Sequence, residues 1–473
     1  MSFYFNLITM KKYFAVILCS LMMAGFWVHS CSDAPKPDPC ETNPAPDCPN
    51  YDPCVDNPTP GCPNYVDSNP VLKNTVTIGT INYTVTDSKV EKIDEGLWYL
   101  YAHVTDSRKP LKIHSVRYTT GLSGYGVETW IGRDSLTGKE APLTMVNRYE
   151  TKGRQVRTAI NGGFYGLAVG AGPMGHQLMN GVSVFVPADD AEKPLPVIGF
   201  DNLNRPYIDF VKTNSKVTIS KNSSEYKITT VNGCDITYNT GGRWENYLVL
   251  YNSYNGKTTR TNQWGMEVLC SPVDGTAWES LDNYTNVRCK VEKITPYDGA
   301  TRNSTPIPRG KFVLSGNSKA LDFLRALQVG DEVVVNLDYY LQNNPQINFS
   351  TLKNVIAGWN IILSNNNVLD YYNNSGSLES GNNPRTCVGY TDDKFHVFFT
   401  VVEGRNPTQG NPTISAGVST KELAQIMQYF GAAHAINLDG GGSSCLMVDK
   451  TTKNFLSDGS QRSVCDGLAI IKK

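Results

Sequence analysis

Alternation of apolar and polar positions dominates the chain after Asn74. The sequence there reads NTVTIGTINYTVT, and LWYLYAHV and LKIHSVRYTT follow with the same period of two. A period of two is typical of β-strands that bury one face. The stretch from Leu195 to Thr230 is again rich in strand-forming residues and is interrupted by Asn and Ser. We therefore expect a strand-rich body.

Two segments have helical spacing instead. Ser318 precedes KALDFLRALQ, which ends before Gly330 and the strand-like EVVVNLDYY. Ser419 precedes TKELAQIMQYF, where Ser419 and Glu422 form a capping box and Gly431 is a suitable stop. We interpret the apolar stripe of this second helix as core. Strand-rich mixed sheets with few helices indicate an α+β fold, preceded by a small β-rich N-terminal region.

The N-terminus has the pattern of a targeting segment. Lys11 and Lys12 precede an apolar run, Tyr13 to Trp27, which is shorter than the roughly 20 residues of a membrane span. The next four residues, ending in Cys31, resemble a bacterial lipobox. We expect residues 1–30 to be a signal peptide and Cys31 to carry lipid. The alternative is a signal cleaved elsewhere, with Cys31 unmodified. The protein would then be exported and held at the bacterial cell envelope, periplasmic or outer, by its lipid anchor only.

Residues 31–66 contain a short tandem repeat, DPCETNPAPDCPNY followed by DPCVDNPTPGCPNY. It has almost no aliphatic residues, so it cannot bury a core. Cys40–Cys48 and Cys54–Cys62 could each close a loop, although four cysteines allow three pairings. Metal binding is the alternative, but the spacing is not Cys-x2-Cys. We expect a semi-rigid, disulfide-pinned spacer.

Charge gives little guidance to partners. The 473 residues contain 43 Lys and Arg against 44 Asp and Glu, for a net charge of -1. Such a balance gives no reason to propose a nucleic-acid partner, although it allows a local basic pocket for one phosphate.

The strongest local signal for chemistry is NLDGGGSS. A strand-like run ends in Asp439, and Gly440, Gly441 and Gly442 precede two hydroxyl residues. Three consecutive glycines suit a loop that approaches something closely or adopts positive φ. Successive backbone N–H groups in such a loop can also bind an anion such as phosphate. The alternative is a plain tight turn between two strands.

A second glycine motif follows the strand-like RTAI. Asn161, Gly162 and Gly163 precede the aromatic residues Phe164 and Tyr165. The aromatic side chains could stack on a sugar face. The alternative is a β-bulge with two core aromatics.

Arginines and carboxylates occupy two further strand ends. Arg385 lies in NPRTCVGY, with Asp392 just beyond it, and Glu403 and Arg405 lie in VVEGR after the strand-like FHVFFT. Arginine suits bidentate phosphate recognition. Each of these charges alone would be read as a solvated surface residue, but together they lie where sites are commonly built.

These four motifs, in this order, resemble the phosphodiester glycosidase family. That family includes the lysosomal "uncovering enzyme", which removes N-acetylglucosamine from mannose 6-phosphate tags. The resemblance runs from roughly Gly96 to the C-terminus, and Arg462 fits a late arginine of the family. Departures leave the exact substrate open: Gly163, Tyr165, Cys387 and Cys445 are unusual at their positions, and Glu403 stands where an Asp is expected.

The resemblance implies hydrolysis of a sugar-1-phosphodiester, with the release of a sugar such as N-acetylglucosamine. We expect the Gly440–Ser443 backbone, with Arg385 and Arg405, to hold the phosphate. We expect sugar contacts from Asn161, Gly162 and Asn437, and we add His176 as a residue that either titrates near neutrality or is structural. The candidate catalytic carboxylates are Asp439, Glu403 and, in reserve, Asp392.

No cofactor is required by this scheme. The three candidate carboxylates could hold Ca²⁺ or Mg²⁺ through oxygen ligands, but no ligand spacing demands a metal. We interpret the six cysteines after residue 66 as disulfides or buried thiols, and Cys270–Cys289 is the first pair to test.

We assign residues 67–150 to the N-terminal β-rich region and residues 151–473 to the catalytic domain. Three alternatives stay open. The chain could be a non-catalytic glycan-binding surface lipoprotein, a phosphodiesterase that cleaves the other side of the phosphate, or a structural surface protein whose glycine loops are only turns.

Overall fold

The computed structural model describes residues 54, 59–60, 62, 65–106, 109–122, 124–166, 172–188, 194–233, 245–301, 303–369, 380–406 and 414–473. The signal segment, Cys31 and most of the tandem repeat lie outside these residues. Within the repeat, Cys54 and Cys62 are each disulfide-bonded. The chain divides into the units Met1–Asn57 and Pro58–Lys473, and the following description concerns the second.

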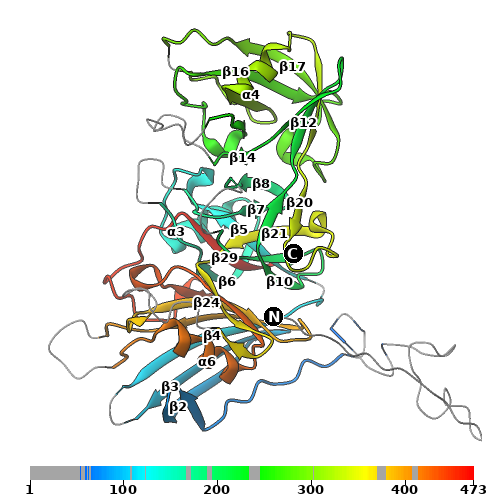
Figure 1. The fold of residues 1–473 in the computed structure, drawn as a ribbon. Helices are drawn as coiled ribbons and strands as arrows, with labels where there is room; N and C mark the ends of the chain where they lie inside the picture. Colours follow the sequence, from blue (N-terminus) through cyan, green and yellow to red (C-terminus); the bar gives the residue numbers. More distant parts are fainter. Residues whose placement is uncertain are drawn as a thin grey trace, which may run out of the picture. The chain divides into compact units, whose positions relative to one another are not determined.

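The second unit has a strand-rich α+β fold with several sheets, as the sequence predicts, and three α-helices in its described part. Its largest sheet has nine strands in the order β1-β2-β3-β4-β25-β24-β26-β22-β23. Of these strands, β2, β3, β4 and β24 are labelled in Figure 1. The nine strands are β1 Thr75–Ile78, β2 Ile81–Asp94, β3 Leu97–Thr105, β4 Leu111–Thr119, β22 Asn360–Ser364, β23 Asn367–Val368, β24 Arg385–Tyr390, β25 His396–Val402 and β26 His434–Asn437. Strands from both sides of residue 150 therefore share one sheet, and that expected boundary does not separate two folded bodies.

Two five-stranded sheets lie next in the fold, in the orders β28-β27-β6-β29-β5 and β10-β9-β21-β7-β8. The first contains β5 Tyr125–Ile131, β6 Gln155–Asn161, β27 Leu446–Val448, β28 Thr451–Thr452 and β29 Asp466–Lys472. The second contains β7 Gln177–Met179, β8 Val182–Phe185, β9 Val197–Asp201, β10 Pro206–Asp209 and β21 Leu352–Ala357. One core cluster joins both sheets to the nine-stranded sheet through residues such as Ile160, Phe200 and Val388.

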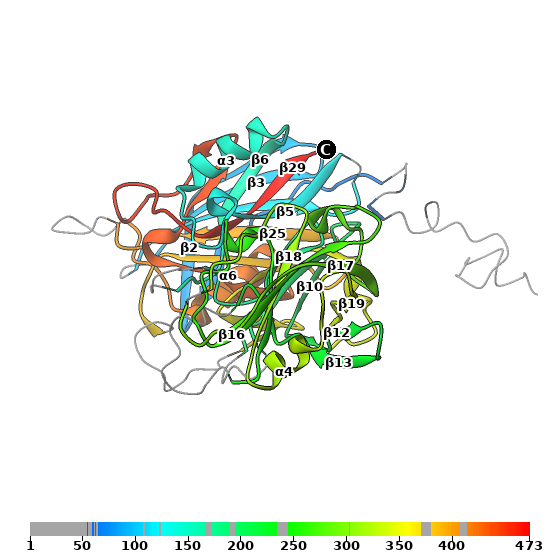
Figure 2. The same ribbon diagram turned by 90° about the horizontal axis from the view of Figure 1, so that it is seen from above.

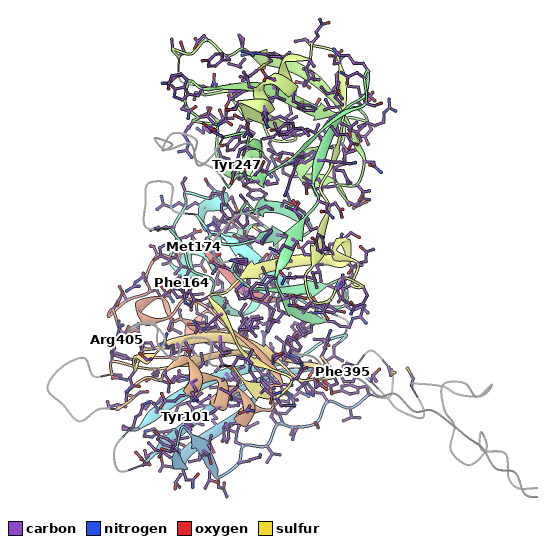
Figure 3. All side chains as sticks on the ribbon, viewed as in Figure 1. Tyr101, Phe164, Met174, Tyr247, Phe395 and Arg405 are labelled. Atoms are coloured by element: carbon purple, nitrogen blue, oxygen red, sulfur yellow. The ribbon has the colours of Figure 1, made fainter. Side chains whose placement is uncertain are left out.

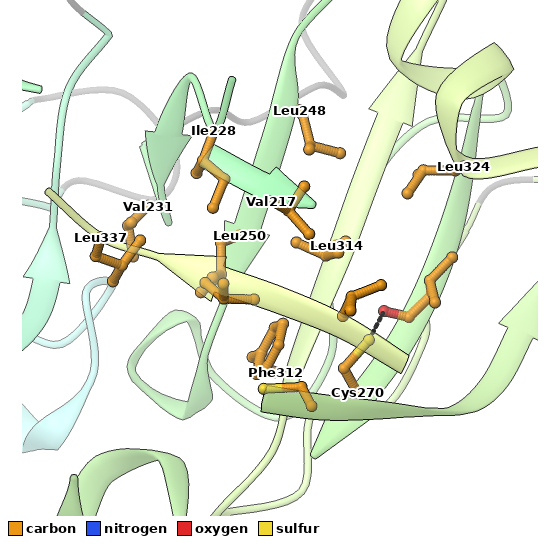
Figure 4. Packing of buried hydrophobic residues seen from close by; sticks show 14 of the residues in the cluster. Val217, Ile228, Val231, Leu248, Leu250, Cys270, Phe312, Leu314, Leu324 and Leu337 are labelled. Carbon is orange, nitrogen blue, oxygen red and sulfur yellow. Dashed lines mark hydrogen bonds between the residues drawn. The ribbon is translucent and has the colours of Figure 1, made fainter. Parts of the chain in front are cut away.

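An eight-stranded sheet in the order β13-β12-β19-β17-β16-β18-β15-β14 has its own core, part of which is shown around Phe312 and Leu314 in Figure 4. Its strands are β12 Lys216–Ile219, β13 Ser224–Lys227, β14 Thr230–Val231, β15 Leu248–Tyr251, β16 Gly265–Pro272, β17 Val287–Thr295, β18 Phe312–Asn317 and β19 Glu332–Asn336. A two-stranded sheet pairs β11 Val211–Thr213 with β20 Tyr339–Leu341.

Of the two interpretations of the body cysteines, disulfides or buried thiols, the described ones are buried thiols, and the first pair to test, Cys270–Cys289, is not bonded. Cys270 and Cys289 are both buried free thiols, as are the three other described body cysteines, Cys387, Cys445 and Cys465. In the β16–β17 ladder, Cys270 lies opposite Val291 and Cys289 lies opposite Pro272, so the two cysteines are two positions out of register. Such diagonal neighbours are about 7–8 Å apart, beyond the usual Cα separation of a disulfide. Cys234 lies outside the described residues.

The helices are α3 Pro142–Thr151, α4 Lys319–Arg325 and α6 Thr420–Phe430, and the short 3₁₀ helices are η1 Gly132–Asp134, η3 Ser253–Asn255, η4 Trp278–Ser280, η5 Phe349–Thr351 and η6 Gly441–Ser443. The capping box of α6 is confirmed, because Ser419 Oγ accepts from the Glu422 amide and the Glu422 carboxylate accepts from the Ser419 amide. Gly431 ends the helix at φ 98°. Helix α3 was not expected, since it starts at a proline without a side-chain cap.

Helix α6 packs on one face of the nine-stranded sheet (Figures 1 and 2). Side chains alternate between the faces: Phe398 contacts the core beneath α6, whereas Phe399 belongs to the core shared with the five-stranded sheets. This double burial holds the central strands in a fixed register. Among the described residues, no helix is long and apolar enough to span a membrane.

Candidate active site

Neighbouring strand ends meet at one edge of the nine-stranded sheet. Arg385, at the start of β24, pairs with Val402 at the end of β25. Asn437, at the end of β26, pairs with Cys387 of β24 and with Asn360 at the start of β22. Because each of these pairs is antiparallel, one strand starts where its neighbour ends.

The same geometry brings together residues from three separate motifs. Asp439 follows β26 by two residues and Arg405 follows β25 by three, so both lie just beyond the edge where Arg385 begins β24. All three line one cavity of about 270 Å³. Figure 3 marks two lining residues, Phe164 and Arg405. The complete lining is Phe164, Trp359, Asn383, Arg385, Arg405, Thr420, Asn437, Asp439, Gly440, Gly441, Gly442 and Arg462.

Asn161, at the end of β6, ties the neighbouring five-stranded sheet to this edge. Its Nδ2 donates to the Asp439 carbonyl at 2.7 Å, and its Oδ1 accepts from Thr386 Oγ1 at 2.9 Å and from the Cys445 amide at 3.1 Å. The Asp439 amide in turn donates to the Gly162 carbonyl at 3.1 Å. Asn161 and Gly162 therefore hold Asp439 in place rather than line the cavity, which corrects the expectation that they contact the sugar.

Asp439 is the one carboxylate among the described lining residues. Burial raises its pKa, and the Ser443 hydroxyl, the Arg462 guanidinium and the Gly440 amide each lower it, with a net rise. A desolvated carboxylate is a stronger base or nucleophile than one in water. Such a group at a cavity wall is a candidate catalytic residue.

Three guanidinium groups line the cavity with Asp439. Arg385 is buried, and its Nε and Nη2 donate to the Val418 and Gly381 carbonyls, both at 2.9 Å. Arg405 Nη2 donates to Asn383 Oδ1 at 2.6 Å. Backbone and amide oxygens thus orient two of the guanidinium groups in the cavity wall.

Arg462 is oriented differently, by a carboxylate. Its Nε and Nη2 both donate to Asp458 Oδ2, at 2.8 and 2.6 Å. The sequence singled out Arg462 only through the family resemblance and gave it no role. Its position on the loop before β29 brings a third positive charge to the cavity.

The glycines of NLDGGGSS allow close packing. A Cβ on Gly440 would lie 2.7 Å from the Pro384 carbonyl oxygen, and a Cβ on Gly442 would lie 2.2 Å from Arg462 Nη2. Gly441 has φ 60°. The expected close approach and positive φ are therefore both present.

The expected anion-binding role of these amides is more restricted. The Gly441 amide donates to the Pro384 carbonyl and the Ser443 amide donates to the Gly440 carbonyl. Two of the N–H groups that the sequence offered to a phosphate are therefore already bonded. The guanidinium groups of Arg385, Arg405 and Arg462 are the cationic groups among the described lining residues.

An aromatic pair lines the cavity as well. Phe164 and Trp359 lie with ring centroids 4.7 Å apart at 41°. Trp359 is held by its amide, which donates to the Asn437 carbonyl at 2.8 Å. Aromatic faces of this kind pack against the C–H faces of sugars. Sequence reasoning gave no role to Trp359, to Asn383 at the start of the NPRTCVGY motif, or to Thr420 at the start of α6.

Asn437 carries an unsatisfied polar atom. Its side chain lines the cavity and is buried, and its Oδ1 has no hydrogen-bond partner within the described residues. Buried acceptors without a partner are costly, so a donor from a bound molecule would be favourable. A hydroxyl or amide N–H of a substrate would supply it.

Glu403 lies outside the cavity lining, contrary to the catalytic role expected for it. Its carboxylate accepts from His114 Nε2 at 2.8 Å, from the Phe455 amide at 2.8 Å and from Asn406 Nδ2 at 3.1 Å. His114 Nδ1 then bonds the Tyr99 hydroxyl at 2.8 Å. Burial raises the pKa of Glu403, but these donors outweigh it and the net shift is downward. The arrangement is that of a buried structural hydrogen-bond network.

Replacing Glu403 with Ala should therefore destabilise the fold by about 1–3 kcal/mol, because His114, Asn406 and the Phe455 amide lose their buried hydrogen-bond partner. The pKa of Glu403 is lower in the folded state than in the unfolded state. The stabilisation that its carboxylate provides is therefore present above the unfolded-state pKa, and it is lost as pH falls through the folded-state pKa. Urea unfolding at pH 7 and pH 4 measures it. A normal unfolding midpoint together with a large loss of activity would instead restore the catalytic role.

Asp392 and His176 also lie elsewhere. Asp392 follows the far end of β24 from Arg385, which places it about 20 Å along the strand direction, and it is exposed beside His434. His176 is buried, and burial followed by the charge of Lys212 lowers its pKa to about 3. Neither residue lines the cavity, and His176 does not titrate near neutrality. Among the described residues, no cluster of His, Cys, Asp or Glu is arranged to hold a metal ion.

Comparison with known families matches the C-terminal part of the chain to the family that its sequence motifs resemble. Residues 286–471 match the phosphodiester glycosidase family model. The match begins near β17 and includes Arg385, Arg405, Asp439 and Arg462, whereas Asn161 and Phe164 precede it. The charged part of the cavity therefore lies inside the family match.

One sequence relative and two solved structures are also similar to this chain. A Bacillus subtilis (strain 168) protein described as "SPbeta prophage-derived uncharacterized protein YomE" is 33% identical over 87 residues, which is 18% of this chain and 12% of the relative's length. A hypothetical protein from Synechocystis has 15% identity and a TM-score of 0.60 over 82% of this chain and 64% of its own. A protein from Burkholderia pseudomallei K96243, named as a candidate exported protein, has 18% identity and a TM-score of 0.56 over 76% and 74%. These structures share the fold.

The catalytic domain of zebrafish N-acetylglucosamine-1-phosphodiester alpha-N-acetylglucosaminidase, in a form inhibited by its pro-peptide, aligns with 12% identity and a TM-score of 0.39 over 84% of this chain and 90% of that domain. This score is too low to support an argument about the present site.

Proposed function

We propose that this protein hydrolyses a sugar-1-phosphodiester, releasing the sugar and leaving a phosphate monoester. The observation that carries the proposal is a cavity in which one half-buried carboxylate, Asp439, lies with the guanidinium groups of Arg385, Arg405 and Arg462. The family match over residues 286–471 supports the same class of reaction.

The number of carboxylates distinguishes this chemistry from ordinary glycoside hydrolysis. A typical glycosidase uses two carboxyl groups, one of which protonates a poor leaving group. The described cavity lining contains Asp439 alone. A phosphate monoester leaves readily without protonation, so a single carboxylate suffices when guanidinium groups stabilise the departing charge.

Asp439 has two possible roles in this reaction. It can activate water for attack on the anomeric carbon, or attack that carbon itself and form a glycosyl intermediate that water then hydrolyses. In both cases its carboxylate must be ionised, and its net raised pKa makes it more basic. The hydrogen bonds from Asn161 Nδ2 and to the Gly162 carbonyl fix the backbone that carries it.

The phosphate and the sugar of the substrate contact different residues of the cavity. Arg385 and Arg405 bind the phosphate oxygens, with Arg462 close to Asp439. The Phe164–Trp359 pair contacts the apolar face of the sugar, and Asn437 Oδ1 accepts from a sugar hydroxyl or amide N–H. N-acetylglucosamine has both kinds of donor.

The location of the protein is part of the same proposal. An acylated Cys31 would anchor an exported chain to the cell envelope, where phosphate-linked glycans are available as substrates. Mass analysis of the mature N-terminus tests this anchor directly. An unacylated Cys31, or cleavage at another residue, would contradict it.

Incubation of the lipid-free body with a panel of sugar-1-phosphodiesters, followed by mass analysis, tests the activity. Free sugar and a phosphate monoester are expected. A sugar phosphate would indicate cleavage on the other side of the phosphate. Saccharide affinity without any product would indicate a glycan-binding protein.

Chelation provides a further prediction. Activity should be unchanged after incubation with EDTA and dialysis, because the described lining offers one carboxylate, fewer than a typical calcium or magnesium site uses. Initial rates before and after treatment measure this. A loss that added Mg²⁺ or Ca²⁺ reverses would show that a metal takes part.

A further inference from the structure

Asp466 lies directly behind the candidate site. It begins β29, which pairs with β6 so that Gly467 lies opposite Asn161. The Asp466 side chain packs against the backbone of Gly162, the residue after Asn161. A Cβ on Gly162 would lie 2.2 Å from Asp466 Oδ1. Because the Gly162 carbonyl accepts the Asp439 amide, one backbone segment separates the two aspartates.

The surroundings of Asp466 favour a neutral side chain. The residue is 1% exposed, and its Oδ1 has no hydrogen-bond partner in the described part of the chain. The carboxyl group interacts with the Cys465 thiol and with the Gly163 amide. No lysine or arginine forms an ion pair with it among the described residues, so an ionised carboxylate there would be poorly compensated.

The packed elements supply no cation either. The thiol of Cys465, the residue before β29, faces Asp466, and Asp439 faces it from the loop after β26. Trp130 of β5 and Met145 of α3 line the small space beside it. Burial above all, and then the charge of Asp439, raise the pKa of Asp466 to about 8.

We propose that Asp466 is a positioning residue for Asp439 and that it acts only in its protonated form. The inference rests on the proposed function of the cavity. The neutral carboxyl group packs beneath Gly162, whose carbonyl holds the Asp439 amide. Loss of its proton places a second negative charge beside Asp439 and strains the segment that holds it. The site therefore loses activity in alkaline solution, when Asp466 ionises beneath Gly162.

The pH dependence of kcat/KM tests this for the wild type and for Asp466→Asn, which is neutral at every pH and has the same shape. The wild-type value should fall up to tenfold per pH unit above about pH 8. The ratio of kcat/KM at pH 6 to that at pH 9.5 should drop at least tenfold in Asp466→Asn. An unchanged ratio in this variant would overturn the proposal.

A matched control is Asp201→Asn. Asp201 is another buried aspartate, and its Oδ1 accepts from the Leu203 and Arg205 amides, contacts that an asparagine oxygen can keep, whereas the ion pair of its Oδ2 with Arg205 Nε is lost. It lies in β9, outside the cavity. This variant should keep the wild-type ratio. If it loses the alkaline decline as Asp466→Asn does, the decline does not come from Asp466 and the proposal fails.

Stability tests the same ionisation without any substrate. The pKa of Asp466 is higher in the folded state than in the unfolded state. Its stabilising contribution is therefore complete below the unfolded-state pKa, and it is lost as pH rises through the folded-state pKa. The unfolding constant of the wild type relative to Asp466→Asn should therefore rise up to tenfold per unit between about pH 4 and about pH 8. A flat relative constant would overturn the proposal.

Coupling to Asp439 is visible in the same measurement. Because the charge of Asp439 raises the pKa of Asp466, the upper end of this pH window should move down in an Asp439→Asn background. If that shift occurs but no phosphodiester is hydrolysed, the coupling of the two aspartates stands and the proposed function fails. An identical window in both backgrounds would show that Asp466 does not act on Asp439.

Discussion

Asp439→Asn should lower kcat/KM for a sugar-1-phosphodiester by about a thousandfold or more, which is roughly 4 kcal/mol of transition-state stabilisation. The amide keeps the shape of the side chain but can neither attack carbon nor accept a proton from water. No other carboxylate lines the described cavity to replace it. Steady-state kinetics with a substrate from the panel measures the loss.

Stability separates this loss from misfolding. Burial opposes the charge of Asp439 and raises its pKa, so removal of the charge should leave the free energy of unfolding at pH 7 unchanged or higher. Asp392→Asn, which changes an exposed aspartate at the other end of β24, is the matched control and should keep wild-type kinetics. A near-normal rate in Asp439→Asn would remove Asp439 from the mechanism.

Arg385→Ala should lower kcat/KM by about a hundredfold to a thousandfold, the usual range for loss of one oriented donor to a developing negative charge. The guanidinium group is buried at the cavity wall and held by two backbone carbonyls, so its direction is fixed before substrate binds. The effect should appear in kcat as well as in KM, because the phosphate gains charge as the sugar leaves.

Arg385→Lys distinguishes the geometry of the group from its charge. Lysine keeps a positive charge but cannot bond both the Val418 and Gly381 carbonyls while it contacts phosphate. It should recover only part of the activity. Because both variants lose structural bonds, thermal unfolding must accompany the kinetics. Full activity in Arg385→Ala would exclude the residue from phosphate binding.

Local signals were sufficient to predict much of the fold. The period-two pattern predicted β1 to β4, and the sequence around Ser419 and Gly431 predicted both ends of α6, because capping and alternation depend on neighbouring residues. The shared sheet was beyond reach. Pairing of β4 with β25 joins segments nearly 300 residues apart and depends on tertiary packing.

The site was predictable where chemistry coincides with a strand end. Arg385, Arg405 and Asp439 meet because their three strands are antiparallel neighbours. The direction of a side chain was not predictable. Glu403 lies only two residues from Arg405, but its carboxylate bonds a histidine on β4. Asp392 shares a strand with Arg385 but lies beyond its opposite end.

Buried connections left no sequence signal of their own. We expected Asn161 to contact the sugar. Its side-chain amide instead bonds Thr386, Cys445 and the Asp439 carbonyl. Asp466 belongs to none of the motifs that the sequence analysis singled out. Only the assembled sheets show that it lies beneath the backbone of Gly162.

Hydrolysis in water enriched with ¹⁸O tests the central claim most directly, because it identifies the bond that breaks. Attack at the anomeric carbon, with Asp439 as base or nucleophile, places the heavy oxygen in the released sugar and leaves the phosphate monoester unlabelled. Heavy oxygen in the phosphate monoester, with none in the sugar, would show cleavage at phosphorus and would contradict the glycosidase account.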